Sequence, residues 1–445
     1  MTTEIAVINR LGVALAADSA VTISGFGVEK VFDTGDKLFE LSASHPVGIM
    51  VNGNLDFLGV PWELIIKDFR NAVPNPAPAS IEGWSLAFID FASKHRAVNF
   101  EQSDLFIERF FDGRISHLQQ RVLAQIQNIL DKTRRNINKS TIAEILDSEL
   151  DARTFELENL TVLRSMSGFT EDQLDKKLGP RIVRTARAKF GKGGLSNKST
   201  KALRRVLIKE LLLTMDDDTR TGLVICGFGG DDLFPSLHAV SIDGVLFDKL
   251  RFDVTHDVEI TRDETPGDRA KELGTAISFA QTDVIDRLLR GGDERLVKGS
   301  ERFVERSVGK GLAGVFDQLG WVLNDSSGAP VPVNEMTTFL SEKLPALYRE
   351  YAARIGDEIE REFKQTISLM PKQELIELAE ALVSITAVER KATRDAGTVG
   401  GPIDVALITR SEGFVWIKRK HYFSAELNPR YLSRVNGYST GGEAR

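Results

Sequence analysis

Short apolar runs joined in pairs by tight turns occur at three separate places in this chain of 445 residues. Near the start, residues 3–9 and 13–17 flank a glycine-containing turn, and residues 37–41 and 47–51 form a second pair. Two such runs separated by a few turn-forming residues are typical of an antiparallel hairpin. The chain therefore begins with hairpins and lacks the regular alternation of strand and helix that a parallel sheet requires.

Further strands are expected in the middle and near the end of the chain. The apolar runs there lie at 222–228, 237–242, 245–252, 403–409 and 414–418. Asp243-Gly244 has the composition of a tight turn, and we expect it to separate the second run from the third. The last two runs flank Ser411-Glu412-Gly413 and are expected to form a final hairpin.

Helical patterns fill the gaps between the hairpins. Apolar spacing predicts two helices within 57–91, with a Pro-rich break between them, and one strong helix over 372–394. Residues 101–217 and 293–371 have an almost wholly helical and highly charged pattern. This order predicts an α+β protein with antiparallel sheets, into which two large helical blocks are inserted.

Composition narrows the class of protein further. Apolar residues make up 42% and charged residues 27%, which is the range of ordinary globular proteins. The only cysteine is Cys226, so we expect no intrachain disulfide, no cysteine-type metal site and a reducing compartment. The first residues have no basic or apolar leader, and no run reaches the length of a membrane span. We expect a cytoplasmic protein with no cofactor, no metal and no membrane.

The charge is unevenly distributed along the chain. The formal net charge is −7, yet the stretch from Lys176 to Lys209 holds twelve Lys/Arg and no acid. One interpretation is a solvated helical face, and the other is a docking surface for an acidic partner or nucleic acid. Phe190 is the only aromatic residue there, so no platform for stacked bases is present. If the stretch docks anything, we favour a protein partner or a neighbouring subunit over nucleic acid.

The second residue is a candidate nucleophile. Thr2 follows the initiator Met1, and a small residue at this position normally permits removal of the methionine. The new terminus would carry a hydroxyl and an α-amine whose ordinary pKa is about 7.7–8.0. Such an amine can accept the proton of its own hydroxyl, which is one way of activating a threonine nucleophile.

The residues after Thr2 resemble the start of the proteasome β-subunit family, including its bacterial relatives. In that family an N-terminal threonine opens the first strand, and an A-x-D-x-x-x-T turn follows the second strand. Without gaps, Thr2 matches the nucleophile, Gly12 the hairpin glycine, Asp18 the acidic residue and Thr22 the last residue of that turn.

The resemblance continues with a lysine and a glycine. The family places a lysine at the start of the next strand. Lys37 is the preferred match, after an insertion of about three residues in the loop 23–36, and Lys30 is the alternative. A glycine closes the following strand before the first helix, and Gly53 occupies that place.

Two later segments extend the resemblance. Residues 222–240 are similar to a pair of family strands, and Gln281 stands where the family usually has a helper serine. The segment Arg394–Gly401 resembles the family's RDa.SGG turn with one extra residue. The resemblance implies that Asp395 and Thr398 hold the amine of the terminal threonine.

The resemblance implies a fold, an activity and partners. The fold would be a four-layer αββα sandwich of two antiparallel sheets. Its core would be made of 1–100, 218–292 and 372–430, the helical insertions would be 101–217 and 293–371, and 431–445 would be a tail. The activity would be that of a threonine-type N-terminal nucleophile (Ntn) hydrolase of peptide or amide bonds, in a self-compartmentalising homo-oligomer.

The resemblance also implies a peptide or protein substrate and allows a regulatory or unfoldase partner. Two rival interpretations remain open. The chain could be a catalytically silent scaffold or binding subunit, or it could be an amidase that acts on small molecules.

Overall fold

A computed structural model describes most of the chain. The described residues are 3–25, 28–96, 100–133, 138–191, 194–247, 249–262, 270–280, 283–304, 307, 309–322, 324–392, 400–421, 423–424 and 427–430. The chain divides into two compact units. The first unit consists of residues 1–35, 260–409 and 415–433, and the second is built mainly from residues 36–259.

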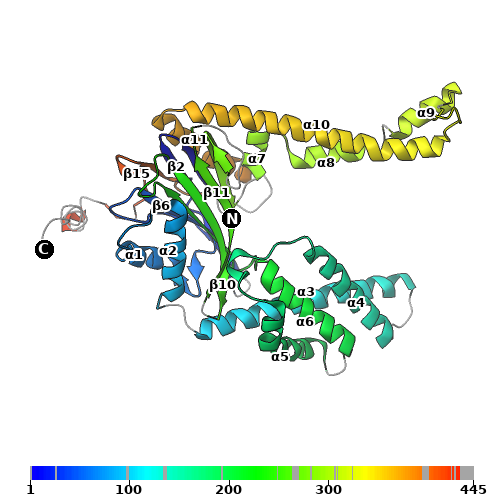
Figure 1. Ribbon diagram of the computed structural model, residues 1–445, viewed down its shortest axis with the longest axis horizontal. Helices are drawn as coiled ribbons and strands as arrows, with labels where there is room; N and C mark the ends of the chain where they lie inside the picture. Colours follow the sequence, from blue (N-terminus) through cyan, green and yellow to red (C-terminus); the bar gives the residue numbers. More distant parts are fainter. Residues whose placement is uncertain are drawn as a thin grey trace. The chain divides into compact units, whose positions relative to one another are not determined.

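The first unit is organised around a five-stranded antiparallel sheet with the order β13-β1-β2-β14-β15. Figure 1 labels two of its strands, β2 and β15. Its strands are β1 (Thr3–Asn9), β2 (Gly12–Ala17), β13 (Gly274–Ala280), β14 (Asp404–Thr409) and β15 (Gly413–Lys418). Helix α11 (Lys372–Ala392) packs on one face, where its Leu375, Leu382 and Val383 join the strand residues Val7 and Val405 in one apolar core. The expected first hairpin, last hairpin and strong helix are thereby confirmed.

Several elements of the first unit were not expected. A second hairpin, β3 (Val21–Gly25) and β4 (Val28–Phe32), occupies part of the segment expected as a loop at 23–36. Strand β13 pairs along the whole of β1, from Thr3 opposite Ala280 to Asn9 opposite Gly274. The remaining elements are β12 (Ala270–Glu272), α7 (Asp283–Arg290), α8 (Glu294–Phe303), α9 (Gly309–Leu319) and α10 (Val333–Leu369).

The second unit contains five of the six strands of the other sheet, in the antiparallel order β11-β10-β9-β6-β5. Their bounds are β5 (Leu38–Glu40), β6 (Val47–Gly53), β9 (Thr221–Gly227), β10 (Ser236–Leu246) and β11 (Lys249–Ile260). Two short strands, β7 (Asp56–Phe57) and β8 (Val60–Pro61), precede the first helix, so this helix begins later than the apolar spacing from residue 57 suggested.

Two helices cover one face of this second sheet. They are α1 (Trp62–Arg70) and α2 (Ile81–Lys94), and the hydroxyl of Ser80 caps the start of α2 by accepting from Gly83 N–H at 3.1 Å. Trp62, Trp84 and Phe88 are buried against the strand residues Ile49 and Ile225. Burial of such large rings is the main apolar contribution to this core.

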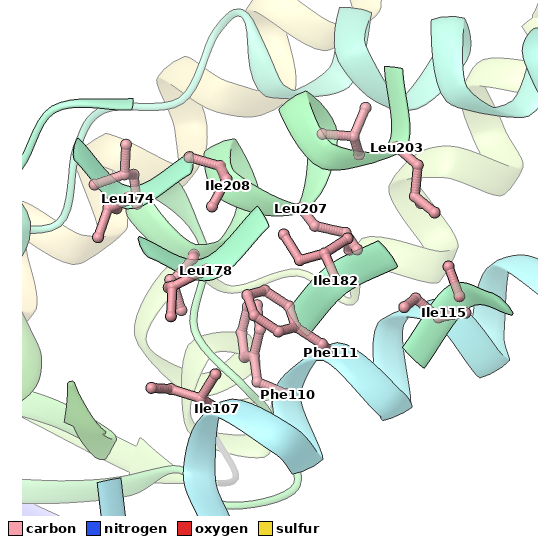
Figure 2. Packing of buried hydrophobic residues seen from close by; sticks show 14 of the residues in the cluster. Ile107, Phe110, Phe111, Ile115, Leu174, Leu178, Ile182, Leu203, Leu207 and Ile208 are labelled. Atoms are coloured by element: carbon pink, nitrogen blue, oxygen red, sulfur yellow. The ribbon is translucent and has the colours of Figure 1, made fainter. Parts of the chain in front are cut away.

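The helical block expected at 101–217 forms a bundle within the second unit. Its helices are α3 (Phe100–Thr133), α4 (Lys139–Leu157), α5 (Glu171–Phe190) and α6 (Asn197–Leu213). Figure 2 shows their shared core, in which Phe110, Phe111, Leu178, Ile182 and Leu207 meet. The same core includes Leu246 at the end of β10, so the bundle and the sheet share one apolar interior.

The prediction of a turn at Asp243-Gly244 is wrong, because β10 runs through both residues with a local shift in register. Gly244 lies so close to Phe106 of α3 that a Cβ there would come within 2.2 Å of the ring. The chain reverses only after Leu246, where Phe247 has a φ of 62°. Gly244 allows close packing and Asp243 forms a buried ion pair, and neither residue reverses the chain.

The buried acid is held by Arg251 of β11. The guanidinium donates from Nε to Asp243 Oδ1 at 3.0 Å and from Nη2 to Asp243 Oδ2 at 2.9 Å, and both side chains are fully buried. It also donates to the backbone carbonyls of Leu211 and Thr214 at the end of α6. Those carbonyls have no partner within the helix, so the arginine satisfies them.

None of the described helices is both long and apolar enough to cross a membrane.

Replacement of Arg251 by Met tests how much this contact contributes to the stability of the fold. The change leaves Asp243 buried without its cation and the end of α6 without its donors, so we expect a loss of about 3–5 kcal/mol in the free energy of unfolding. The surface substitution Arg184→Met, which removes only an exposed pair with Glu108, should cost less than about 1 kcal/mol. Urea unfolding of both variants measures the difference, and equal losses would contradict this account.

Candidate active site

The residues expected at the site fall into two groups. Asp18, Lys37 and Gly53 lie within the described residues, whereas Thr2, Gln281, Asp395 and Thr398 lie outside them. Asp18 belongs to the first unit, and Lys37 and Gly53 belong to the second. Their local surroundings are therefore described one unit at a time.

The carboxylate of Asp18 holds the backbone beside the proposed nucleophile. Asp18 directly follows β2, and its Oδ1 accepts the backbone N–H of Thr3 at 3.0 Å. Its Oδ2 accepts the backbone N–H of Gly400 at 3.0 Å, and its own N–H donates to Thr3 O at 3.1 Å. One buried side chain thus links the residue next to Thr2 with the chain that leads into β14.

Ser19 strengthens the same junction, although no sequence pattern pointed to it. Its hydroxyl donates to Pro402 O at 2.6 Å, and its N–H donates to Gly400 O at 3.2 Å. Gly401 has a φ of 77°, and a Cβ there would lie 2.8 Å from Asp33 O. Glycine is needed at 401 because both the backbone conformation and the space exclude a side chain. In the sequence, Gly401 could be selected because it lies in the expected glycine-rich turn.

The two candidate lysines have different environments. Lys37 precedes β5, is only 1% exposed, and its carbonyl accepts the N–H of Val51 at 2.8 Å. Lys30 lies on β4, is exposed, and places its Nζ 5.0 Å from the centre of the Phe32 ring. A lysine is rarely buried unless its charge is paired or used. Burial therefore favours Lys37 as the functional lysine.

Gly53 ends β6 in a conformation that few other residues adopt. Its φ is 75°, and a Cβ would lie 2.5 Å from the carbonyl oxygen of Arg220, just before β9. The strand pairing places Gly53 opposite Thr221. A side chain at this position would push the end of β6 away from β9, so the backbone N–H here is fixed by packing.

Several residues of the basic stretch form ion pairs within the second unit. Arg181 pairs with Asp104 at 2.5 Å and with Glu108 at 3.3 Å, and Lys189 pairs with Asp112 at 2.9 Å. These acids recur every four residues along α3, so α3 and α5 form a ladder of ion pairs. Lys198 pairs with Asp147, and Arg204 with Asp175. The stretch therefore contributes to contacts between helices, which favours a role within the helical bundle over the docking of a partner.

Alternative chemistry finds little support among the described residues. Cys226 is fully buried in β9, and burial raises the pKa of its thiol, which disfavours the reactive thiolate. Among the described side chains, no group of three or more His, Cys, Asp or Glu could hold a metal ion.

Comparisons with known proteins give no matching family model and no matching curated protein. Three solved structures are similar at low scores. Anbu (ancestral beta-subunit) from Yersinia bercovieri has 11% identity and a TM-score of 0.26, covering 100% of this chain and 98% of that chain. An Anbu (Gly-1) mutant from Hyphomicrobium sp. strain MC1 also has 11% identity and a TM-score of 0.26, with 100% and 99% covered.

A helical assembly of the Anbu complex from Pseudomonas aeruginosa has 10% identity and a TM-score of 0.23, with 100% and 98% covered. These scores assign neither a fold nor a function to this chain.

Gly53→Ala tests whether packing fixes this backbone. We expect a loss of about 1–3 kcal/mol from the strained φ, increased by the clash with Arg220 O. Gly59→Ala is the matched control, because Gly59 has a φ of 83° but no atom within 4 Å of the added Cβ. Thermal unfolding should show the larger loss for Gly53→Ala. A smaller loss there than at Gly59 would mean that the strands adjust freely.

Proposed function

We propose that this chain is a threonine-type Ntn hydrolase that cleaves peptide or other amide bonds. The observation that carries the proposal is the carboxylate of Asp18, which accepts the N–H of Thr3 and so fixes the backbone directly after Thr2. The spacing from Thr2 to Asp18, with Gly12 between them, is the spacing of the proteasome β-subunit family. The burial of Lys37 adds independent support.

The proposal includes the four-layer αββα sandwich. Each sheet carries helices on one face, and apolar residues alternate with those that face the helices. In the first sheet Ala6, Ile8 and Leu15, which alternate with the residues facing α11, are fully buried. In the second sheet Met50, Val224 and Cys226 are buried on the face opposite α1 and α2. A sheet with this pattern of burial is suited to the middle of a sandwich.

The proposed reaction starts with Thr2 at the mature N-terminus. Its Oγ attacks the carbonyl carbon of the amide, while its own α-amine accepts the hydroxyl proton, through a water or directly. The proton then passes to the leaving amine as the C–N bond breaks, and the acyl group remains on Thr2 as an ester. Attack by water on this ester releases the acid and restores the hydroxyl.

The other site residues have supporting roles in this proposal. The ammonium of Lys37 favours loss of the hydroxyl proton, and Asp18 keeps that cation charged and oriented. The N–H of Gly53 donates to the oxyanion as the tetrahedral intermediate forms. Asp395 and Thr398 hold the terminal amine, and these two assignments follow from the family turn alone.

Homo-oligomeric assembly and a peptide or protein substrate are part of the same proposal. They follow from the resemblance in sequence, as does the possibility of a regulatory or unfoldase partner. An inactive scaffold and a small-molecule amidase are the alternative outcomes of the experiments below.

The Thr2 hydroxyl is tested by substitution together with the mass of the intact protein. We expect Met1 to be absent and Thr2→Ala to lose turnover of a fluorogenic peptide on the order of 10³-fold or more, because no nucleophile remains. Thr2→Ser keeps a hydroxyl and should retain measurable turnover and labelling by a β-lactone. Retention of Met1 on nearly all chains would favour the scaffold, whereas turnover of small amides alone would favour the amidase.

The choice of lysine is tested by a matched pair of substitutions. Lys37→Ala should reduce turnover by about 10²–10³-fold, because the cation that favours the alkoxide is gone. Lys30→Ala removes an exposed lysine and should leave turnover near that of the wild type. Melting temperatures of both variants separate loss of activity from loss of the fold. The reverse order of activities in two folded proteins would assign the role to Lys30.

A further inference from the structure

The first unit carries a helical arm whose described side chains are mostly exposed. We define the arm as residues 294–351, which include α8, α9 and the first half of α10 (Figure 1). Helix α10 has 37 residues and is therefore roughly 55 Å long. Its last turns are anchored by Ile367, which is buried with Leu375 of α11. Among the described side chains between Asp286 and Thr366, only Pro345 is buried.

The arm instead exposes large apolar side chains. Nine of them have exposed fractions between 47% and 68%, namely Leu296, Phe303, Val315, Leu319, Trp321, Val322, Phe339, Leu347 and Tyr351. A large exposed apolar surface on a soluble protein usually marks an interaction site. Ordering a long helix also costs conformational entropy, and apolar side chains that stay exposed do not offset that cost. Both arguments imply that another surface covers the arm.

The spacing of these residues indicates what kind of surface fits. Phe339, Leu347 and Tyr351 lie on a single row of α10, in which residues recur every fourth position with Lys343 between them. Val315 and Leu319 have the same separation on α9. Rows of this kind are the ridges by which one α-helix packs into the grooves of another. The expected partner is therefore helical.

We propose that the arm of a second copy of this chain covers this surface, in a two-fold pairing of arm with arm. The arm holds eight acids and seven bases, so two copies meet without net repulsion, unlike the chain as a whole. The nine side chains expose on the order of 900 Å² of apolar surface, compared with ~800 Å² per partner in a standard interface. A two-fold contact uses the same patch on both copies, which satisfies both arms at once.

This pairing does not depend on the proposed hydrolase activity. It adds one specific contact to whatever assembly the two sheets form, and turnover by Thr2 can be present or absent without affecting it. Measurements of mass and of crosslinking therefore test the arm separately from the active site.

The first experiment measures the mass of the full chain by sedimentation. The variant Leu347→Glu/Tyr351→Glu places two charges in the proposed contact, and we expect its mass to fall below that of the wild type at the same concentration. The dissociation constant should rise by at least about 100-fold, because each buried charge would be unpaired. Phe155→Glu, at a 69% exposed side chain of α4 in the other unit, is the control and should keep the wild-type mass.

The second experiment uses the single cysteine of the chain. Because Cys226 is fully buried, the wild type should give no product with a short bis-maleimide crosslinker. Leu347→Cys should give a covalent dimer, and Phe155→Cys should not. Equal masses for the wild type and the double variant, or the absence of a Leu347→Cys dimer, would overturn the proposal and mean that something other than a second arm covers the surface.

Discussion

The contact between Arg251 and Asp243 determines how the second unit is built. A guanidinium and a carboxylate with no exposure are tolerated only because both carboxylate oxygens and all three guanidinium nitrogens have partners. The same guanidinium lies 5.5 Å and 5.4 Å from the centres of the Phe106 and Phe110 rings. It also donates hydrogen bonds to the backbone carbonyls of Leu211 and Thr214 at the end of α6. Strand β10, strand β11 and two helices of the bundle therefore meet at one cation.

Only part of the fold could be predicted from the sequence, and this contact is one reason. Apolar runs and their spacing predicted the strands from 3–17, 37–51 and 403–418 and the helix that begins at Lys372, since these patterns are local. The Asp243-Gly244 turn failed because an acid followed by glycine has the same composition in a turn and in a buried ion pair. Only the position of Arg251 eight residues later, across the hairpin, distinguishes them. The basic stretch was ambiguous for a similar reason, because most of the acids that pair with it lie on other helices, chiefly α3.

The candidate site was predictable to a different degree. The motif spacing selected Asp18, and its side chain bonds to the backbone of Thr3, a contact between residues fifteen positions apart. Gly53 could be selected from the end of its strand, but the carbonyl of Arg220 that excludes a side chain comes from a distant part of the chain. Ser19 has no signal of its own, because a serine after an acid is common in turns. Lys37 and Lys30 differ in burial, which a single sequence does not reveal, and the assignment of the functional lysine stays a prediction.

The two helical insertions differ in how far they are integrated into the protein. The bundle of α3–α6 shares its interior with Leu246 of the sheet, and its last helix ends on an arginine that the sheet supplies. Removal of the bundle would expose the sheet and leave a buried charge without its surroundings, so the bundle has become an inseparable part of its unit. Among the described residues, the buried apolar contact of α10 with the core of the sheet is made by Ile367 in its last turns. The arm is therefore a detachable module, which evolution or a protein engineer could shorten, exchange or lose while the sheet beneath it stays intact.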